Sequence, residues 1–343
     1  MDETILAILV QDGVILGAIY ALLAVALVVV FSVTRVILVP QGDFVTFAGL
    51  TMAALEMGRA PAAAALLFGL GCVAFLFDLA AAVRNGDRLA LARSFAFRVL
   101  LSASIGALAL LGHDAMPGPL MNILICFALI VPMGAHVYRI AFQPLANASV
   151  LVLLMSAVGA HIALMSLGLL VFGAEGYRTS PLVEGELEVA GLIFTGQSLL
   201  VLGVTAALLT ALALFFRGTI WGKALRASAV SRSGAQIVGI APDKAGEAAF
   251  AMAAGIAVVS AILIGPMVTL YFDSGFYMTL KGFVAAIIGG MSGYVGSVAA
   301  SLGVGSLESF SSFWFSALKD VLVFALVIPV LFWRSLTSHA EEE

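Results

Sequence analysis

The sequence predicts an all-α membrane protein, built as a polytopic bundle of transmembrane helices. Of its 343 residues, 62% are hydrophobic and 10% are charged, and the mean hydropathy is +1.15. Soluble domains carry about 25% charged residues, so most of this surface must face lipid. The apolar runs reach about 20 residues, the length that spans a bilayer as a helix. They are continuous and do not alternate with polar residues, which argues against a β-barrel.

About ten hydrophobic segments are expected along the chain. The second of them is short, so it either tilts or is partly re-entrant. The ninth is interrupted by GGMSGYVG, from Gly289 to Gly296, which predicts a broken helix there. In order, the segments are 13–34, 43–57, 61–83, 95–111, 118–140, 150–173, 191–216, 246–266, 281–307 and 317–333.

The third and fourth segments form a hairpin joined by the basic turn RNGDRLALARSF. We interpret residues 58–117 as a two-helix insertion that packs at the periphery of an eight-segment core. No soluble domain and no low-complexity linker is visible, so residues 1–343 are expected to form a single transmembrane domain.

The positions of the bases predict the orientation, because cytoplasmic loops are enriched in Lys and Arg. If the segment 217–244 lies inside, 12 of the 16 Lys and Arg residues lie inside or at the inner interface. The opposite side receives the acidic loop AEGYRTSPLVEGELEVAG. The C-terminal tail is cytoplasmic only if the interrupted segment returns to the outer side. The inner bases are Arg35, Arg84, Arg88, Arg93, Arg98, Arg139, Arg217, Lys223, Arg226, Arg232, Lys244 and Arg334.

Signs of an enzyme are missing from the sequence. It has no Walker lysine loop, no HExxH and no paired-cysteine motif. Cys72 and Cys126 fall in apolar runs and are interpreted as buried small hydrophobes. His136 and His161 also lie in apolar runs, where we expect hydrogen-bonded packing residues. No metal, cofactor or nucleic-acid partner is expected, and the first residues, MDETILAILV, lack the basic region of a cleaved signal peptide.

A basic, alanine-rich stretch, WGKALRASAVSRSGAQIVGI, separates the seventh and eighth segments. It predicts one or two short helices on the cytoplasmic side. One interpretation is a solvated inner loop, as most basic loops are. The other is a docking helix for a soluble partner, because small residues let another surface approach closely and the stretch is long for a plain connector. Periodicity leaves both interpretations open.

This stretch resembles the cytoplasmic loop of the permease subunits of branched-chain amino acid ABC importers, the LivH/LivM type. In that family a G-x-A-x-R-A-x-A run is followed by GI and a transmembrane helix. The resemblance implies that this loop is the coupling element that docks in a groove of the ATPase subunit. The matching positions here are Gly222, Ala224, Arg226, Ala227, Ala229, Gly239 and Ile240.

Other blocks resemble the same family in the same order. GVILGAIYALLAVALVVVFSVTRVI is similar to its first helix, and YRIAFQPLANASVLVLLMSAVG to the block written ERVAYRPLR. MTLKGFVAAIIGGMSGYVGSVAASLGVGSLES is similar to its KAF-AA-x-GG-x-GS-x-G block, and ALKDVLVFALVIPVLFWR to its last helix. The match covers nearly all of the chain outside about residues 58–117.

The resemblance implies a permease in the bacterial inner membrane that imports branched-chain amino acids or related small carboxylates. It implies three kinds of partner besides lipid: a second homologous permease, a pair of ATP-binding cassette subunits, and an extracytoplasmic substrate-binding protein. ATP hydrolysis would lie in the partner subunits. The sequence departs from the family at LVPQGDF, where the family has NFAHGE, and at Val230 and Ser231, which replace an acidic pair. Members of the family also carry urea or aromatic acids, so these compounds stay among the expected substrates.

The remaining polar and glycine-rich positions are expected to line the translocation path. Asp43 is either a water-facing helix cap or a path residue. Lys281 and Glu308 can each snorkel to an interface. The glycines either pack helices tightly or free backbone groups in a break, where Ser292 and Ser297 can supply partners. The expected path residues are Gln41, Gly42, Asp43, Gly289, Gly290, Ser292 and Gly293.

Two other functions compete with the importer. A secondary transporter working without ATPases would need paired ionisable residues deep in the membrane and internal repeats. A structural membrane subunit would use the glycines for packing only. Co-purification of an ATPase with the chain would separate the importer from both.

Overall fold

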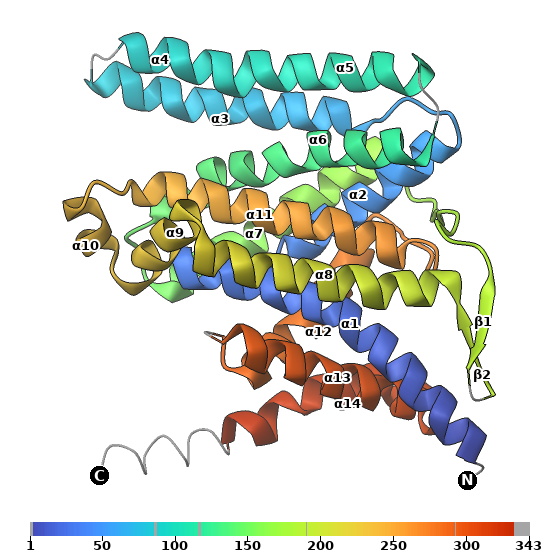
Figure 1. Ribbon diagram of the computed structural model, residues 1–343. Helices are drawn as coiled ribbons and strands as arrows, with labels where there is room; N and C mark the ends of the chain where they lie inside the picture. The colour runs from blue at the N-terminus through green and yellow to red at the C-terminus, as the bar shows by residue number, and fades with distance from the viewer. Residues whose placement is uncertain (1–2, 86–87, 116–117, 190, 292, 333–343) are drawn as a thin grey trace, which may run out of the picture. The chain divides into compact units, whose positions relative to one another are not determined.

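The computed structural model describes residues 3–85, 88–115, 118–189, 191–291 and 293–332 (Figure 1). Helices make up nearly all of the regular structure in these residues, which confirms the expected all-α class. The exception is an antiparallel ribbon in the acidic loop, formed by β1 (Glu186–Val189) and β2 (Leu192–Thr195).

Seven helical stretches in the described part of the chain are long and apolar enough to cross a membrane. The second predicted segment is the shorter helix α2 (Gln41–Glu56). The ninth is divided between α12 (Ser274–Gly289) and α13 (Tyr294–Trp314), and the tenth begins as a 3₁₀ turn and continues as α14 (Lys319–Ala325). The seven stretches are Thr4–Thr34, Ala63–Val83, Leu91–Gly112, Pro119–Leu145, Val150–Phe172, Gly196–Gly218 and Pro242–Ile264.

The chain divides into two compact units. The first contains α1 (Glu3–Thr34) up to Val28, Val183–Ala213 and the chain from Tyr277 onward. The second contains Val29–Leu182 and Leu214–Phe276.

The core of the second unit is built on α2, α6 (Pro119–Val137) and α11 (Pro242–Ile264), which pack against one another. Fourteen of the 16 residues of α2 are buried, including the polar residues Gln41 and Asp43. Helices α6 and α11 approach closely because Gly134 has no side chain: a Cβ there would lie 2.5 Å from the carbonyl oxygen of Phe250. Small residues permit this kind of packing in membranes.

The predicted hairpin is present in the second unit. It consists of α3 (Ala63–Asn85), α4 (Arg88–Phe95), a π-helical turn (Ala96–Leu100) and α5 (Leu101–Ala115). The two arms pack on each other and on α6 (Figure 1). Only 22% of an 18-residue apolar window in each arm is buried, so most of the surface of the hairpin is free to face lipid.

In the first unit, α1 packs on α13 through glycines. A Cβ on Gly13 would lie 2.7 Å from the Cα of Ser306, and one on Gly17 would lie 2.7 Å from the Cα of Leu302. Gly305 approaches the backbone of Gly17 from the other helix. Glycines four residues apart on one face are a known route to close helix contact in lipid.

The remaining elements complete both units. The π-helical turn Tyr138–Phe142 and the 3₁₀ turn Gln143–Leu145 join α6 to α7 (Val150–Phe172). Helix α8 (Gly196–Gly218) leads into α9 (Ile220–Val230) and α10 (Arg232–Ile237), the two short helices that the basic stretch predicts.

Candidate translocation path and coupling segment

The first candidate path residues lie at the start of α2. The chain leaves α1 at Thr34, runs without helical structure to Pro40, and enters α2 at Gln41 inside the second unit. The side-chain amide of Gln41 donates a 3.0 Å hydrogen bond to the carbonyl oxygen of Ala253. Its amide oxygen is buried without a partner among the described residues. A buried acceptor without a donor is costly, so this atom marks a place where water or a substrate group would be stabilised.

Asp43 is 1% exposed and faces His161 of α7. The Nδ1 atom of His161 lies 2.8 Å from one carboxylate oxygen of Asp43 and 3.0 Å from the other. The ring of Phe276 stacks on the imidazole, with 4.8 Å between centroids. The interpretation of Asp43 as a water-facing cap is therefore wrong, because its partner is an imidazole inside the protein. The expectation that His161 is a hydrogen-bonded residue is confirmed.

Gly42 lies between these two polar residues and has a specific neighbour. A Cβ placed on Gly275 would lie 2.2 Å from the carbonyl oxygen of Gly42. The beginnings of α2 and α12 therefore meet backbone to backbone. The carboxylate of Asp43 accepts hydrogen bonds and the amide of Gln41 offers a free acceptor, so this region is suited to bind donor groups such as an ammonium.

The other candidate path residues surround the break between α12 and α13. Helix α12 ends at Gly289 and α13 begins at Tyr294, and φ is +94° at Gly290 and +48° at Met291. This confirms the expected broken helix. A Cβ on Gly289 would lie 2.3 Å from the backbone nitrogen of Ser297, so the two sides of the break touch.

Of the two serines expected to bond the backbone at the break, Ser297 does so. The Ser297 hydroxyl donates a 2.9 Å hydrogen bond to the carbonyl oxygen of Gly293, the residue before α13. Ser292 lies outside the described residues. Non-helical backbone at membrane depth requires such internal partners.

A buried ionic cluster joins the helices on both sides of the break. The Nζ atom of Lys281 lies 2.5 Å from Oε1 of Glu308 and 3.0 Å from Asp320. The hydroxyl of Tyr20 donates a 2.6 Å hydrogen bond to the other oxygen of Glu308, and Lys281 lies over the Tyr20 ring. The expectation that Lys281 and Glu308 each snorkel to an interface is wrong, since both side chains are nearly buried and paired.

The coupling segment is formed by α9 and α10 in the second unit. Thr219 caps α9 by accepting a hydrogen bond from the amide of Gly222, and Ser231 caps α10 by accepting one from Gly234. Ser and Thr are favoured helix caps. Gly239 has φ +83°, which favours glycine, in the turn before α11.

The residues of the family loop divide between two faces of α9. Gly222 faces the chain itself, where a Cβ would lie 2.3 Å from the carbonyl oxygen of Phe215. Ala224, Ala227 and Ala229 are half-buried, and Arg226 is exposed. Large apolar side chains on α9 and α10 are also exposed, including Val230 at 85% and Ile237 at 86%. The outer face is therefore mixed, with the exposed bases Lys223 and Arg226 among apolar groups.

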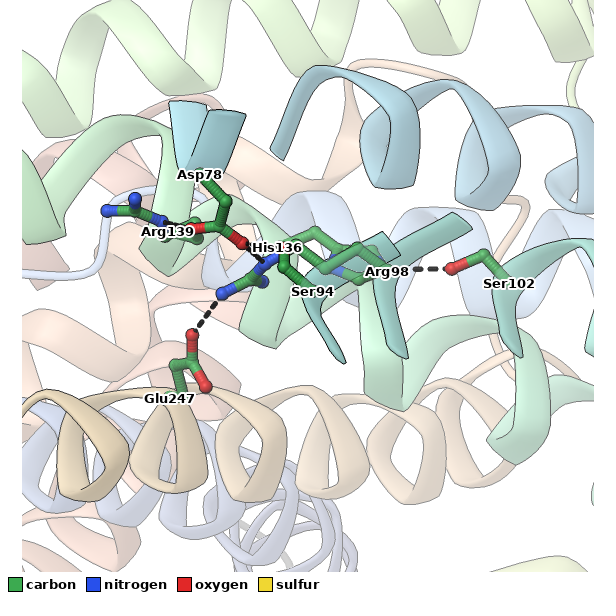
Figure 2. Close-up of polar contacts among 7 residues, drawn as sticks. All are labelled: Asp78, Ser94, Arg98, Ser102, His136, Arg139 and Glu247. Carbon is green, nitrogen blue, oxygen red and sulfur yellow. Dashed lines mark hydrogen bonds and ion pairs between the residues drawn. The ribbon is translucent and has the colours of Figure 1, made fainter. Parts of the chain in front are cut away.

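A polar cluster in the hairpin escaped the sequence analysis (Figure 2). Asp78 of α3 accepts hydrogen bonds from Arg98, Arg139 and Ser94, and Arg98 also contacts Glu247 of α11 at 2.6 Å. Ser102 and His136 share a further 3.0 Å contact. The available signal was one acid and two bases, Asp78, Arg98 and Arg139, spread over three successive apolar segments. Charges inside a membrane pair with one another.

The described residues contain no group of three or more His, Cys, Asp or Glu that could hold a metal ion. Cys72 and Cys126 are free thiols. The site chemistry consists of buried ion pairs, backbone groups near glycines and an exposed mixed face.

Comparison with known proteins gives one family. The profile described as branched-chain amino acid transport system / permease component matches residues 9–331. The chain is 30% identical over 241 residues to the high-affinity branched-chain amino acid transport system permease protein BraD of Pseudomonas aeruginosa. This alignment covers 67% of the chain and 78% of BraD. The chain is 32% identical over 208 residues to LivH of Escherichia coli, covering 58% and 67%. No solved structure matches the chain.

Proposed function

Because the chain belongs to the branched-chain amino acid transport system permease family, we propose that it is the membrane-spanning subunit of a bacterial ABC importer. Its substrates are branched-chain amino acids or related small carboxylates, with aromatic acids and urea as the other candidates. Its helices that are apolar enough to span a bilayer support a multi-pass membrane protein. The family supports the inner membrane as its location. The chain itself hydrolyses nothing.

The outer face of α9 and α10 is the observation that carries the assembly with ATPases. Val230 and Ile237 are exposed on this basic segment between two candidate membrane-spanning helices. Exposed apolar groups rimmed by polar ones are typical of protein interfaces. Two ATPase subunits would bind this face and the same face of a second permease. Their closure on ATP would move α9 and switch the path between outward and inward states.

The path is proposed to use Gln41, Gly42 and Asp43 in one unit, and Gly289, Gly290, Ser292 and Gly293 in the other. Support for the first group is the buried acceptor on Gln41 and the Asp43–His161 pair. Support for the second is the broken helix, because discontinuous helices form binding sites in many transporters. An extracytoplasmic binding protein would deliver the substrate and set most of the specificity.

The hairpin at about 58–117 is proposed to be an insertion at the periphery of the path. Its low burial supports this position. A photo-reactive group at exposed Leu108 should then label lipid. Cross-linking of this group to a bound substrate analogue would place the hairpin at the path instead.

The test is reconstitution. The chain is co-expressed with the second permease, the ATPases and the binding protein of the same organism, purified, and placed in proteoliposomes. We expect ATPase co-purification and ATP-dependent uptake of leucine, isoleucine or valine, with benzoate and urea tested in parallel. Uptake by the chain alone under an ion gradient would support a secondary transporter and overturn the proposal.

A further inference from the structure

A pocket of about 990 Å³ lies in the second unit, and none of the candidate path residues lines it. Residues of the hairpin, including Arg93, Phe97 and Arg98, form one wall. Lys244 and Glu247 of α11 form another, and Trp221 of α9 lies at its edge. Its volume is at the upper end of the range for small-molecule sites, about 300–1,000 Å³. An occupant of this pocket would touch both the hairpin and the coupling segment.

The charges in and behind the pocket favour an anion. Both acids near it are already paired, since Asp78 contacts Arg98 and Arg139, and Glu247 contacts Arg98. Arg93 and Lys244 are exposed bases for which the described part of the chain provides no partner. The four bases therefore exceed the two acids by two positive charges.

Arg98 supplies a second and independent sign of a ligand. Its side chain lines the pocket and the residue is only 7% exposed. Two of its three guanidinium nitrogens contact Asp78 and Glu247, as Figure 2 shows, whereas Nη1 is buried without a partner in the described structure. A buried charged donor without an acceptor is costly, and an anionic oxygen would satisfy it.

The other half of the pocket is apolar. Phe97 and Leu101 are exposed, and Ala248 and Ala251 contribute small apolar surfaces on α11. A small hydrophilic anion would leave these walls uncovered. An acyl chain would cover them, and the exposed indole of Trp221 has the apolar body and polar edge typical of residues at the headgroup level of a bilayer.

We propose that this pocket binds one anionic phospholipid. The phosphate lies against Arg93, Lys244 and the free nitrogen of Arg98, and an acyl chain runs along Phe97 and Leu101. The bound lipid ties the hairpin to the start of α9. This site is separate from transport of the substrate, so the binding step does not depend on the proposed function.

The experiment measures lipid retention by native mass spectrometry on the chain purified in mild detergent. Phosphatidylglycerol and phosphatidylcholine are added in equal amounts. We expect one phosphatidylglycerol to remain bound in preference to phosphatidylcholine. Each base next to an anionic lipid strengthens binding roughly fivefold, so Arg93→Ala/Lys244→Ala should weaken retention by about 25-fold.

Two further variants make the result specific to the pocket. Ala251→Phe fills the apolar half without a change of charge and should also reduce retention. Arg217→Ala/Lys223→Ala removes the same charge from exposed bases that do not line the pocket, and it should retain the lipid. Equal loss in this control and in Arg93→Ala/Lys244→Ala would overturn the proposal, as would equal retention of the two lipids.

A final arm separates lipid from free phosphate. Glycerol 3-phosphate and inorganic phosphate are added at millimolar concentration to the lipid-bound chain. We expect neither to displace phosphatidylglycerol, because neither covers the apolar wall. Displacement by either compound would mean that the pocket recognises the phosphate alone, and the assignment to a phospholipid would be wrong.

Discussion

Lys281 and Glu308 connect the helices on the two sides of the glycine break, with 2.5 Å between Nζ and Oε1. Both side chains are nearly buried, and Tyr20 of α1 donates to the same carboxylate. The pair therefore holds α1, α12 and α13 together in the first unit. The two residues are 27 positions apart in the sequence. They come into contact because the chain turns back at the break.

Removal of one partner of this pair should destabilise the protein. Lys281→Met leaves the Glu308 carboxylate buried with only a neutral donor, and such losses cost about 3–5 kcal/mol. The double variant Lys281→Met/Glu308→Leu removes both members of the pair and leaves only Asp320, whose side chain is 46% exposed, so it should recover most of the stability. Thermal unfolding in detergent measures both. If the double variant is less stable than Lys281→Met, the two residues do not act as a pair.

The Asp43–His161 contact is expected to matter for both stability and transport. His161→Ala leaves a carboxylate that is 1% exposed without its partner, at a cost of about 3–5 kcal/mol. The double variant His161→Ala/Asp43→Asn removes the charge and should recover stability without recovering uptake. Unfolding temperature and substrate uptake are measured side by side.

Thr51→Val is the matched control on the same helix. The buried Thr51 hydroxyl has no partner among the described residues, so its replacement by a methyl group should be neutral or stabilising. Recovery of uptake together with stability in His161→Ala/Asp43→Asn would show that the pair is structural only.

The break predicts different results for different glycines. Gly290 has φ +94°, so Gly290→Leu forces a side chain into a conformation that costs about 1–2 kcal/mol. Transport should fall while membrane insertion is retained. Gly303→Ala in α13 is the control, because a Cβ there meets no atom within 4 Å. A fully active complex with Gly290→Leu would contradict a role for the break in transport.

The hairpin cluster predicts a contrast between two aspartates. Asp78→Ala leaves Arg98 and Arg139 without their shared carboxylate in a mostly buried site, so a loss of about 3 kcal/mol is expected. Asp243→Ala breaks an ion pair in which the Arg232 side chain is 32% exposed and the Asp243 side chain is 50% exposed. This change should cost about 0–1 kcal/mol. Denaturant or thermal unfolding compares them. Similar losses would mean that the cluster does not anchor the hairpin.

The helices and the break could be predicted because hydropathy and glycine act locally. The apolar runs correspond to helices, and GGMSGYVG contains the end of α12 and the start of α13. The short second segment gave no sign that α2 would be buried on nearly every side. Hydropathy reports that a residue avoids water, and it does not distinguish lipid from protein as the neighbour.

The candidate site was predicted in part for the same reason. Asp43 was interpreted as either a water-facing cap or a path residue, because its partner His161 lies 118 positions away in the sequence. Gly222 matched the coupling loop, whereas the structure turns it toward Phe215. Contacts between distant segments depend on helix packing, which no local pattern contains.

Arg226 tests the coupling segment. It is exposed on α9, no described residue pairs with it, and apolar Val230 lies one turn further along the helix. If this face binds an ATPase subunit, Arg226 becomes buried against acids or carbonyls, where an unpaired charge costs about 3–5 kcal/mol. Arg226→Glu should therefore reduce ATPase co-purification and substrate-stimulated hydrolysis.

Arg217→Glu is the matched control, since it makes the same charge reversal at an exposed base at the end of α8. An exposed base contributes about 0–1 kcal/mol to any pair, so this variant should retain the ATPase. Substrate binding to the proposed extracytoplasmic protein should be normal in both, because α9 is expected on the cytoplasmic side. If Arg226→Glu retains the ATPase as well as Arg217→Glu does, Arg226 is a solvated base and the ATPase binds elsewhere.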